Sequence, residues 1–148
     1  MTGYVLALHV IAWIEFELAN YSVAKRRCRK CLKFLKGLSQ SESLHRDEAF
    51  CDYYATDQLY LLAQIYEAGR QHRKAFVICE LLRSCSPQYK PFKDYKTVTE
   101  MLEQIKANTG KSKVERYSRQ IVQALSGELT SIWQVYDFIT SQLLASKS

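Results

Sequence analysis

Proline constrains this chain more than any other residue, because it occurs only twice, at Pro87 and Pro91. A proline inside a helix removes a hydrogen bond and restrains the residue before it. The residues before Pro87 can therefore form long helices, and the whole chain has only five glycines. A sheet protein needs more turn residues than this. We predict an all-α fold whose clearest break lies at Ser86–Pro91.

Apolar residues recur at helical spacing along most of the chain, which supports this fold class. Between 23 and 38 one face is apolar and the opposite face is basic. The short connections make consecutive helices neighbours. We predict about seven helices, packed as consecutive antiparallel hairpins in a single domain over 1–148. Their approximate positions are 4–18, 23–38, 47–68, 72–84, a segment around 95–105, a segment around 117–125 after Gly110, and 128–145.

Length, cysteine content and charge limit the class of protein. A chain of 148 residues suits one domain and leaves no room for a second, catalytic one. Five cysteines at irregular spacing do not form a secreted disulfide framework, so we expect a cytoplasmic or nuclear protein. The apolar segment 4–18 contains Glu15 and Glu17 and is too short for a membrane span. The net charge of +6 allows an acidic partner.

One string of residues resembles the tetratricopeptide repeat, a family of stacked helical hairpins. Its members are Leu62-Ala63, Tyr66, Gly69, Ala75, Leu82 and Pro87. In that family a large and a small residue lie in helix A, a small residue lies early in helix B, and proline closes the unit. The small residues allow the two helices to approach closely.

The first hairpin repeats part of this pattern. Ala24 follows Ala12 at the interval that separates Ala75 from Ala63, and Cys28 and Cys79 then share a repeat position. The two units lie 51 residues apart, whereas the family's period is about 34. Glu15 replaces the family's tyrosine, and Gly69 lies one place early. The resemblance covers 4–87, and we expect the helices of 91–146 to act as a cap or a docking element.

The resemblance implies a partner-binding groove lined by helix A side chains. Such a groove binds a peptide or a helix, and an aromatic pair such as Trp13 and Tyr60 would anchor it. The alternative is that both aromatic residues belong to the core. The groove residues implied by the resemblance are His9, Trp13 and Glu17 in the first unit and Tyr60, Gln64 and Glu67 in the second.

The second segment carries a basic face with no acidic residue in it. Its positive charges add up, so the face could contact phosphate groups. The alternative is a solvated outer surface, which such repeats expose on helix B. Arg70, His72, Arg73 and Lys74 form a smaller basic group to which the same alternatives apply. The residues of the basic face are Lys25, Arg26, Arg29, Lys30, Lys33 and Lys36.

The final segment carries an aromatic and aliphatic stripe at helical spacing. If part of this stripe is exposed, we expect it to form a second protein interface. Its residues are Ile132, Trp133, Tyr136 and Ile139.

No motif in the sequence indicates catalysis, a cofactor or a metal. Glycine-rich phosphate loops, H-E-x-x-H and G-x-S-x-G are absent from the sequence. Cys28 and Cys31 form a C-x-x-C, but the second ligand pair of a zinc site is missing. Because both lie on the apolar face, we expect small buried hydrophobic residues. We predict that the chain is not an enzyme.

These observations favour a protein-protein interaction adaptor or a scaffold subunit of a larger assembly. It would bind a peptide or helix on its helix A face. The alternative is a helical protein that binds nucleic acid through the basic face. Two repeat units are fewer than the three usually needed for stability, so we also expect self-association or a stabilising partner.

Overall fold

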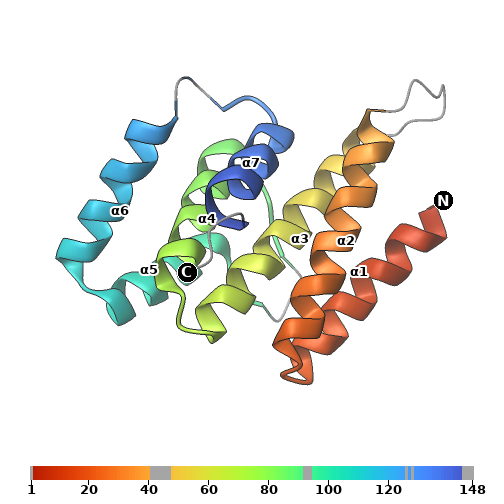
Figure 1. Cartoon of the computed structure of the whole chain (residues 1–148), viewed down its shortest axis with the longest axis horizontal. Helices are drawn as coiled ribbons and strands as arrows, with labels where there is room; N and C mark the ends of the chain where they lie inside the picture. The colour runs from red at the N-terminus through yellow and green to blue at the C-terminus, as the bar shows by residue number, and fades with distance from the viewer. Residues whose placement is uncertain (1, 41–47, 92–94, 126, 128, 145–148) are drawn as a thin grey trace.

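The computed structural model describes residues 2–40, 48–91, 95–125, 127 and 129–144. Within these residues the chain forms seven α-helices and one π-helical turn, without a strand, so the predicted all-α class is confirmed (Figure 1). The elements are α1 (Thr2–Glu17), α2 (Tyr21–Ser39), α3 (Glu48–Ala68), α4 (His72–Cys85), α5 (Val98–Thr109), α6 (Lys111–Ala124), α7 (Ile132–Ile139) and the π-helix η1 (Thr140–Leu144).

The last helix begins later than the sequence predicts. Its expected ends, 128 and 145, lie outside the described residues, but Leu129 to Ser131 are described and are not helical. Ser131 caps the helix, since its hydroxyl accepts from Trp133 N at 3.1 Å and Gln134 Oε1 accepts from Ser131 N at 3.1 Å. These reciprocal hydrogen bonds satisfy backbone N–H groups at the beginning of α7 and fix the start of the helix at Ile132.

The turns that follow α1 and α3 share one backbone geometry. Ala19 and Arg70, which occupy equivalent places, both have a φ of 61°. The next residue of each turn, Asn20 or Gln71, donates its N–H to the carbonyl five residues earlier, at 2.9 and 2.8 Å. The left-handed residue of the second turn is therefore Arg70, and Gly69 directly precedes it.

The small residues of the internal repeat are buried where the helices meet. Without long side chains, α1 and α2 approach closely, and so do α3 and α4. The 51-residue correspondence in the sequence is thus also a correspondence in structure. The residues concerned are Ala12, Ala24, Ala63, Ala75, Cys28 and Cys79, each with an exposed fraction of 0%.

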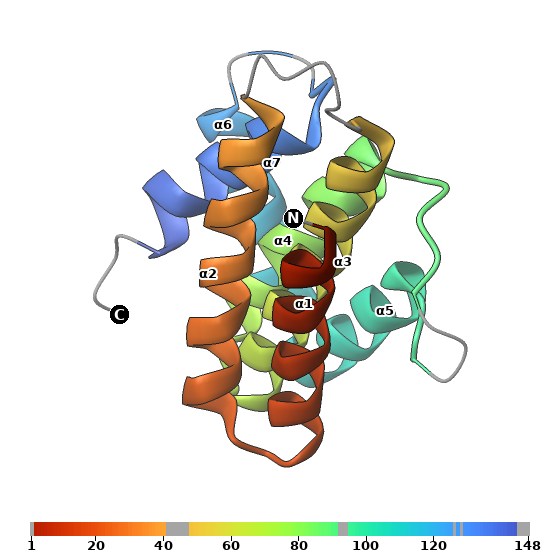
Figure 2. The same ribbon diagram turned by 90° about the vertical axis from the view of Figure 1, so that its right-hand side faces the viewer.

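The helices lie on two sides of the molecule. In Figure 2, α1, α3 and α5 lie toward one side, and α2 and α7 lie toward the other. Each helix from α1 to α4 packs on the helix that follows it in the chain, so that α5 is the last of this series. The hairpin pattern changes after α5, because α6 turns away at Gly110 and packs on α4 (Figure 1).

The core is centred on α3, where every residue from 55 to 67 is buried. A helix that is apolar on one stripe only would leave an exposed face, but α3 contacts α1, α2, α4 and α7. This burial includes the polar residues Asp57, Gln58, Gln64 and Glu67. Buried polar groups need hydrogen-bond partners, so these side chains show how the surrounding elements are held.

None of the described helices is long and apolar enough to cross a membrane.

Candidate binding surfaces

His9 and Trp13, two of the predicted groove residues, belong to a buried polar network around Asp57. Trp13 Nε1 donates to Asp57 Oδ2 at 2.8 Å, and the Tyr89 hydroxyl donates to Asp57 Oδ1. His9 Nε2 lies 3.4 Å from Asp57 Oδ2. The network joins α1, α3 and the segment after α4. Its first role is therefore to hold these elements together.

The second His9 nitrogen, Nδ1, lies 2.9 Å from Gln58 Nε2. If the amide donates, Nδ1 is the acceptor and the His9 proton is on Nε2, facing Asp57. Burial lowers the pKa of His9 below its ordinary 6.5, although the Asp57 charge opposes this shift. The neutral imidazole is thus the form that the folded protein favours.

Acidification is expected to destabilise the protein through His9. Because its pKa is lower in the folded chain, the unfolded chain binds the proton more tightly below pH 6.5. The stability that neutral His9 contributes to the fold is fully present above pH 6.5. It falls, by up to about 1.4 kcal/mol per pH unit, as the pH approaches the folded-state pKa of His9. Urea unfolding at pH 7.5 and 5.5 should show a smaller pH effect in His9→Phe. An unchanged pH effect in His9→Phe would contradict this assignment.

Tyr60, the predicted aromatic partner of Trp13, is fully buried. Its hydroxyl donates to the backbone carbonyl oxygens of Lys96 and Thr97, the latter at 3.2 Å. Burial raises the pKa of this phenol well above its usual value. The segment leading into α5 therefore covers Tyr60, whose side chain serves as a tether in this structure.

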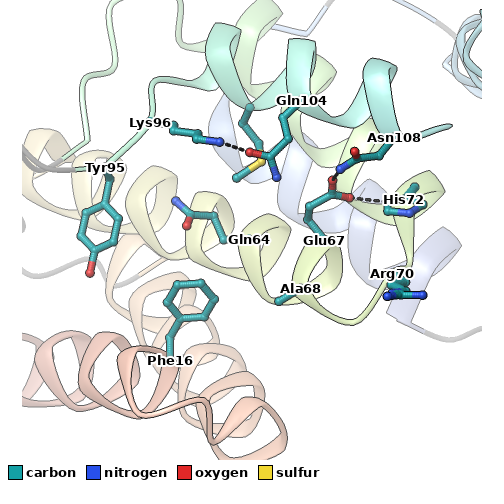
Figure 3. A pocket seen from close by; sticks show the side chains of 11 residues that line it. Phe16, Gln64, Glu67, Ala68, Arg70, His72, Tyr95, Lys96, Gln104 and Asn108 are labelled. Atoms are coloured by element: carbon teal, nitrogen blue, oxygen red, sulfur yellow. Dashed lines mark hydrogen bonds and ion pairs between the residues drawn. The ribbon is translucent and has the colours of Figure 1, made fainter. Parts of the chain in front are cut away.

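Gln64 and Glu67 line a groove of about 680 Å³ among α1, α3, α5 and the turn after α3 (Figure 3). Glu67 accepts from Asn108 Nδ2 at 3.2 Å, and its Oε1 lies 2.5 Å from His72 Nδ1. Phe16 and Tyr95 form the end of the groove nearest α1. The structure thus brings two predicted groove residues to one open site.

An apolar cleft of about 320 Å³ lies on the outer side of α1. Its lining includes three more of the six predicted groove residues, His9, Trp13 and Glu17, together with Tyr95. The Tyr95 ring lies 4.3 Å from the Trp13 ring, centroid to centroid, and its hydroxyl donates to Glu17. The rim consists of Val10, Ile14 and Leu18, with exposed fractions of 49%, 50% and 64%.

The cleft belongs to a larger exposed apolar surface, which we call the α1 face. From Thr2 to Ile14 the helix has no acidic residue, lysine or arginine. Together its side chains expose on the order of 500 Å², a size that marks interaction sites on monomers. The α1 face consists of Tyr4, Leu6, Val10, Ile11, Ile14 and Leu18.

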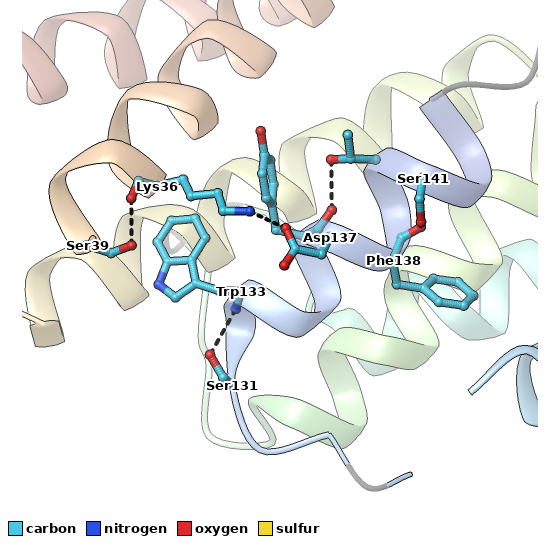
Figure 4. Close-up of polar contacts among 9 residues, drawn as sticks. Lys36, Ser39, Ser131, Trp133, Asp137, Phe138 and Ser141 are labelled. Carbon is cyan, nitrogen blue, oxygen red and sulfur yellow. Dashed lines mark hydrogen bonds and ion pairs between the residues drawn. The ribbon is translucent and has the colours of Figure 1, made fainter. Parts of the chain in front are cut away.

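The basic face of α2 is exposed along its centre and engaged at its ends. Lys25 Nζ lies 5.8 Å from the centre of the Tyr66 ring. Lys36 pairs with Asp137 of α7 and lies 5.3 Å from the Tyr136 ring centre (Figure 4). The central residues have no ion pair within the described part of the chain, and they are Arg26, Arg29, Lys30 and Lys33.

The predicted C-terminal stripe is divided between core and surface. Ile132 and Ile139 are buried, while Trp133 and Tyr136 are half-buried. In Figure 4 Trp133 projects from α7 toward α2. Its ring lies 5.8 Å from the Tyr136 ring. Only the two aromatic residues are thus available in part to a partner.

The two cysteines of the C-x-x-C are buried, as predicted from the apolar face of α2. Cys28 Sγ donates to the Gln58 carbonyl oxygen at 2.9 Å. Burial raises the pKa of Cys28 well above its usual value and that of Cys31 to about 12. Both thiols therefore stay protonated, and the described residues contain no group of three potential ligands suited to a metal.

Sequence reasoning missed Tyr95, which contributes to both the α1 cleft and the groove. No local pattern could identify it, because its contacts are with residues about 80 positions earlier.

In comparisons with known proteins, no family model matches the chain, and neither a curated protein nor a solved structure does so.

Proposed function

We propose that this protein is an interaction adaptor in a larger assembly, and that it docks the apolar side of a partner's amphipathic helix on the α1 face. The observation that carries the proposal is the exposed, uncharged surface of α1 with an aromatic cleft beside it. Binding without catalysis is its proposed activity. The five free thiols favour the cytoplasm or nucleus as the place of action.

The form of the α1 face favours a helix as the occupant. Leu6, Val10, Ile14 and Leu18 follow one another at intervals of four residues, which forms a ridge along one helix. A second helix can pack beside such a ridge, with apolar anchors at helical spacing. Since the face has no charge before Glu15, the matching partner surface is apolar rather than charged.

The two hairpins with equivalent turns support a tetratricopeptide-like interpretation of the first half. In such an array helices α1, α3 and α5 are the ones that face a ligand, and these three line the groove. The cleft and the groove share Tyr95. We therefore propose that the partner's helix occupies the α1 face and that its flanking segment follows the groove.

A second candidate function, nucleic-acid binding, is favoured by the central basic residues of α2. Four exposed cationic side chains without an ion pair in the described chain would each add salt-dependent affinity for phosphates. This surface lies on a different helix from the α1 face. The two functions can therefore be separated by variants.

Replacing Ile14 by glutamate is expected to weaken partner binding by about 30-fold or more, because it places a carboxylate at the centre of an apolar contact. The matched control is Val122→Glu on α6, where the valine is 74% exposed. Both tagged variants and the wild type would be used to capture partners from cell extract at low and high salt. Bound protein and nucleic acid would both be quantified.

We expect a set of proteins that stays bound to the wild type at high salt. These proteins should be lost from the Ile14→Glu variant and retained by the Val122→Glu variant. Equal recovery with both variants would contradict docking on the α1 face. Recovery of nucleic acid that disappears at high salt would favour the basic face instead. If the bound protein is another copy of this chain, the α1 face is a self-association surface and the adaptor proposal fails.

A further inference from the structure

Besides the groove and the α1 cleft, a hollow of about 300 Å³ lies where the beginnings of α4 and α6 meet. Its lining includes four cationic side chains, Arg70, Arg73, Lys74 and Lys113. The described lining residues include no aspartate or glutamate. Arg70, Arg73 and Lys74 come from one turn, but Lys113 lies about 40 positions further along the chain. The fold thus gathers charge that the sequence keeps apart.

Two helix N-termini border this hollow, and neither has a side-chain cap. The residues before α4 and α6 are Gln71 and Gly110, and no side chain caps either helix. The first-turn N–H groups of an α-helix have no acceptor within the helix. They carry partial positive charge, and neither first turn contains an acidic residue that would offset it. Backbone and side chains therefore favour an anion at the same place.

Lys74 brings a further positive charge to the hollow from a position close to two other cations. Its exposed fraction is only 8%, and the ion pairs of the described residues do not include Lys74. The ammonium lies 5.3 Å from the Tyr66 ring centre, and Lys25 approaches the same ring at 5.8 Å. Burial, Lys25 and Arg73 all lower the pKa of Lys74. An anion in the hollow would offset this repulsion.

The hollow adjoins the groove, because Arg70, His72 and Asn108 line both. Glu67 lies on the groove side, where it is engaged by His72 and Asn108. The α1 cleft, the groove and the basic hollow thus lie next to one another, with Tyr95 shared by the first two and Arg70 by the last two. A segment that enters along the groove would bring a side chain into the hollow.

We propose that this hollow binds a phosphate monoester, presented as a phosphorylated side chain by the segment that follows the groove. A dianion with three acceptor oxygens can use several cationic side chains and N–H groups at once. The small volume, about 300 Å³, favours one phosphate group over an extended backbone. The inference deepens the proposed function, since it names the chemistry of the ligand.

The probe is O-phospho-L-serine, with serine and inorganic phosphate alongside, in calorimetric titrations of the whole chain. Saturable binding of phosphoserine is expected, without binding of serine. The double variant Arg73→Gln/Lys113→Gln should weaken it by at least about tenfold, the cost of one or two charge-assisted hydrogen bonds. The matched control is Lys30→Gln/Lys33→Gln, which removes the same charge from exposed positions on α2 and should change affinity less than about twofold.

Three results would overturn the proposal. They are an absence of saturable phosphoserine binding, equal losses in both double variants, and displacement by a single-stranded oligonucleotide whose binding depends on Lys30 and Lys33. The test is separate from that of the proposed function, because Ile14→Glu should leave phosphoserine affinity unchanged. Phosphoserine binding together with partner recovery insensitive to Ile14→Glu would retain this site and reject docking on the α1 face.

Discussion

Replacing Asp57 by alanine is expected to lower the free energy of unfolding by about 3 to 5 kcal/mol, a large part of the total stability of a domain. The carboxylate is fully buried and accepts from Trp13 and Tyr89, with His9 beside it. Without it these groups remain buried with an acceptor missing, and an unsatisfied buried polar group costs about 1 to 3 kcal/mol. Urea unfolding monitored by circular dichroism measures the change.

Asp57→Asn is the matched variant for this experiment. Asparagine keeps the shape of the side chain and one acceptor oxygen. The loss of unfolding free energy should therefore be clearly smaller than with alanine. Because the network joins α1 to α3 and to the segment after α4, the alanine variant should also increase hydrogen exchange in α1. An alanine variant as stable as the wild type would show that the network does not hold α1 in place.

Replacing Phe76 by alanine is the second change with a large expected effect, again about 3 to 5 kcal/mol of unfolding free energy. Phe76 lies on α4, is fully buried and has its ring centroid 6.1 Å from that of Tyr117 on α6. The substitution leaves a cavity and removes an aromatic contact between α4 and α6. Calorimetric melting measures the loss, and Phe76→Leu should restore most of it.

The position of α6 gives a second measurement for this variant. Hydrogen exchange should increase in α6 more than in α1 and α2, because α6 loses an aromatic contact with the core. Val122→Ala, at an exposed position on α6, should change stability by less than about 0.5 kcal/mol. A uniform increase of exchange over all helices would contradict the expected local role of Phe76.

Helix positions and the internal repeat could be predicted from the sequence because both depend on local spacing. Apolar periodicity identifies α2 and α4, and the intervals Ala12 to Ala24 and Ala63 to Ala75 identify equivalent hairpins. The start of α7 was predicted too early. The stretch that precedes Ser131 has apolar spacing, but the cap that ends the loop depends on side-chain bonds.

The candidate site could be predicted only in part, because its residues meet through long-range contacts. The resemblance implies that Trp13 and Tyr60 share a groove, and the alternative is that both belong to the core. In the structure Tyr60 is covered by a segment that lies 36 and 37 positions further along the chain. Asp57 gives no signal of its own in the sequence. The helix α1 is apolar on nearly every side, so its pattern does not indicate which side faces solvent.

The most direct test of the α1 face as a docking surface is photo-crosslinking at three positions in cell extract. A photoreactive phenylalanine analogue would replace Ile14 on the α1 face, Lys33 on the basic face or Val122 on α6. The account predicts discrete protein adducts at position 14 and few at positions 33 and 122. Adducts to nucleic acid at position 33 and none to protein at position 14 would contradict it.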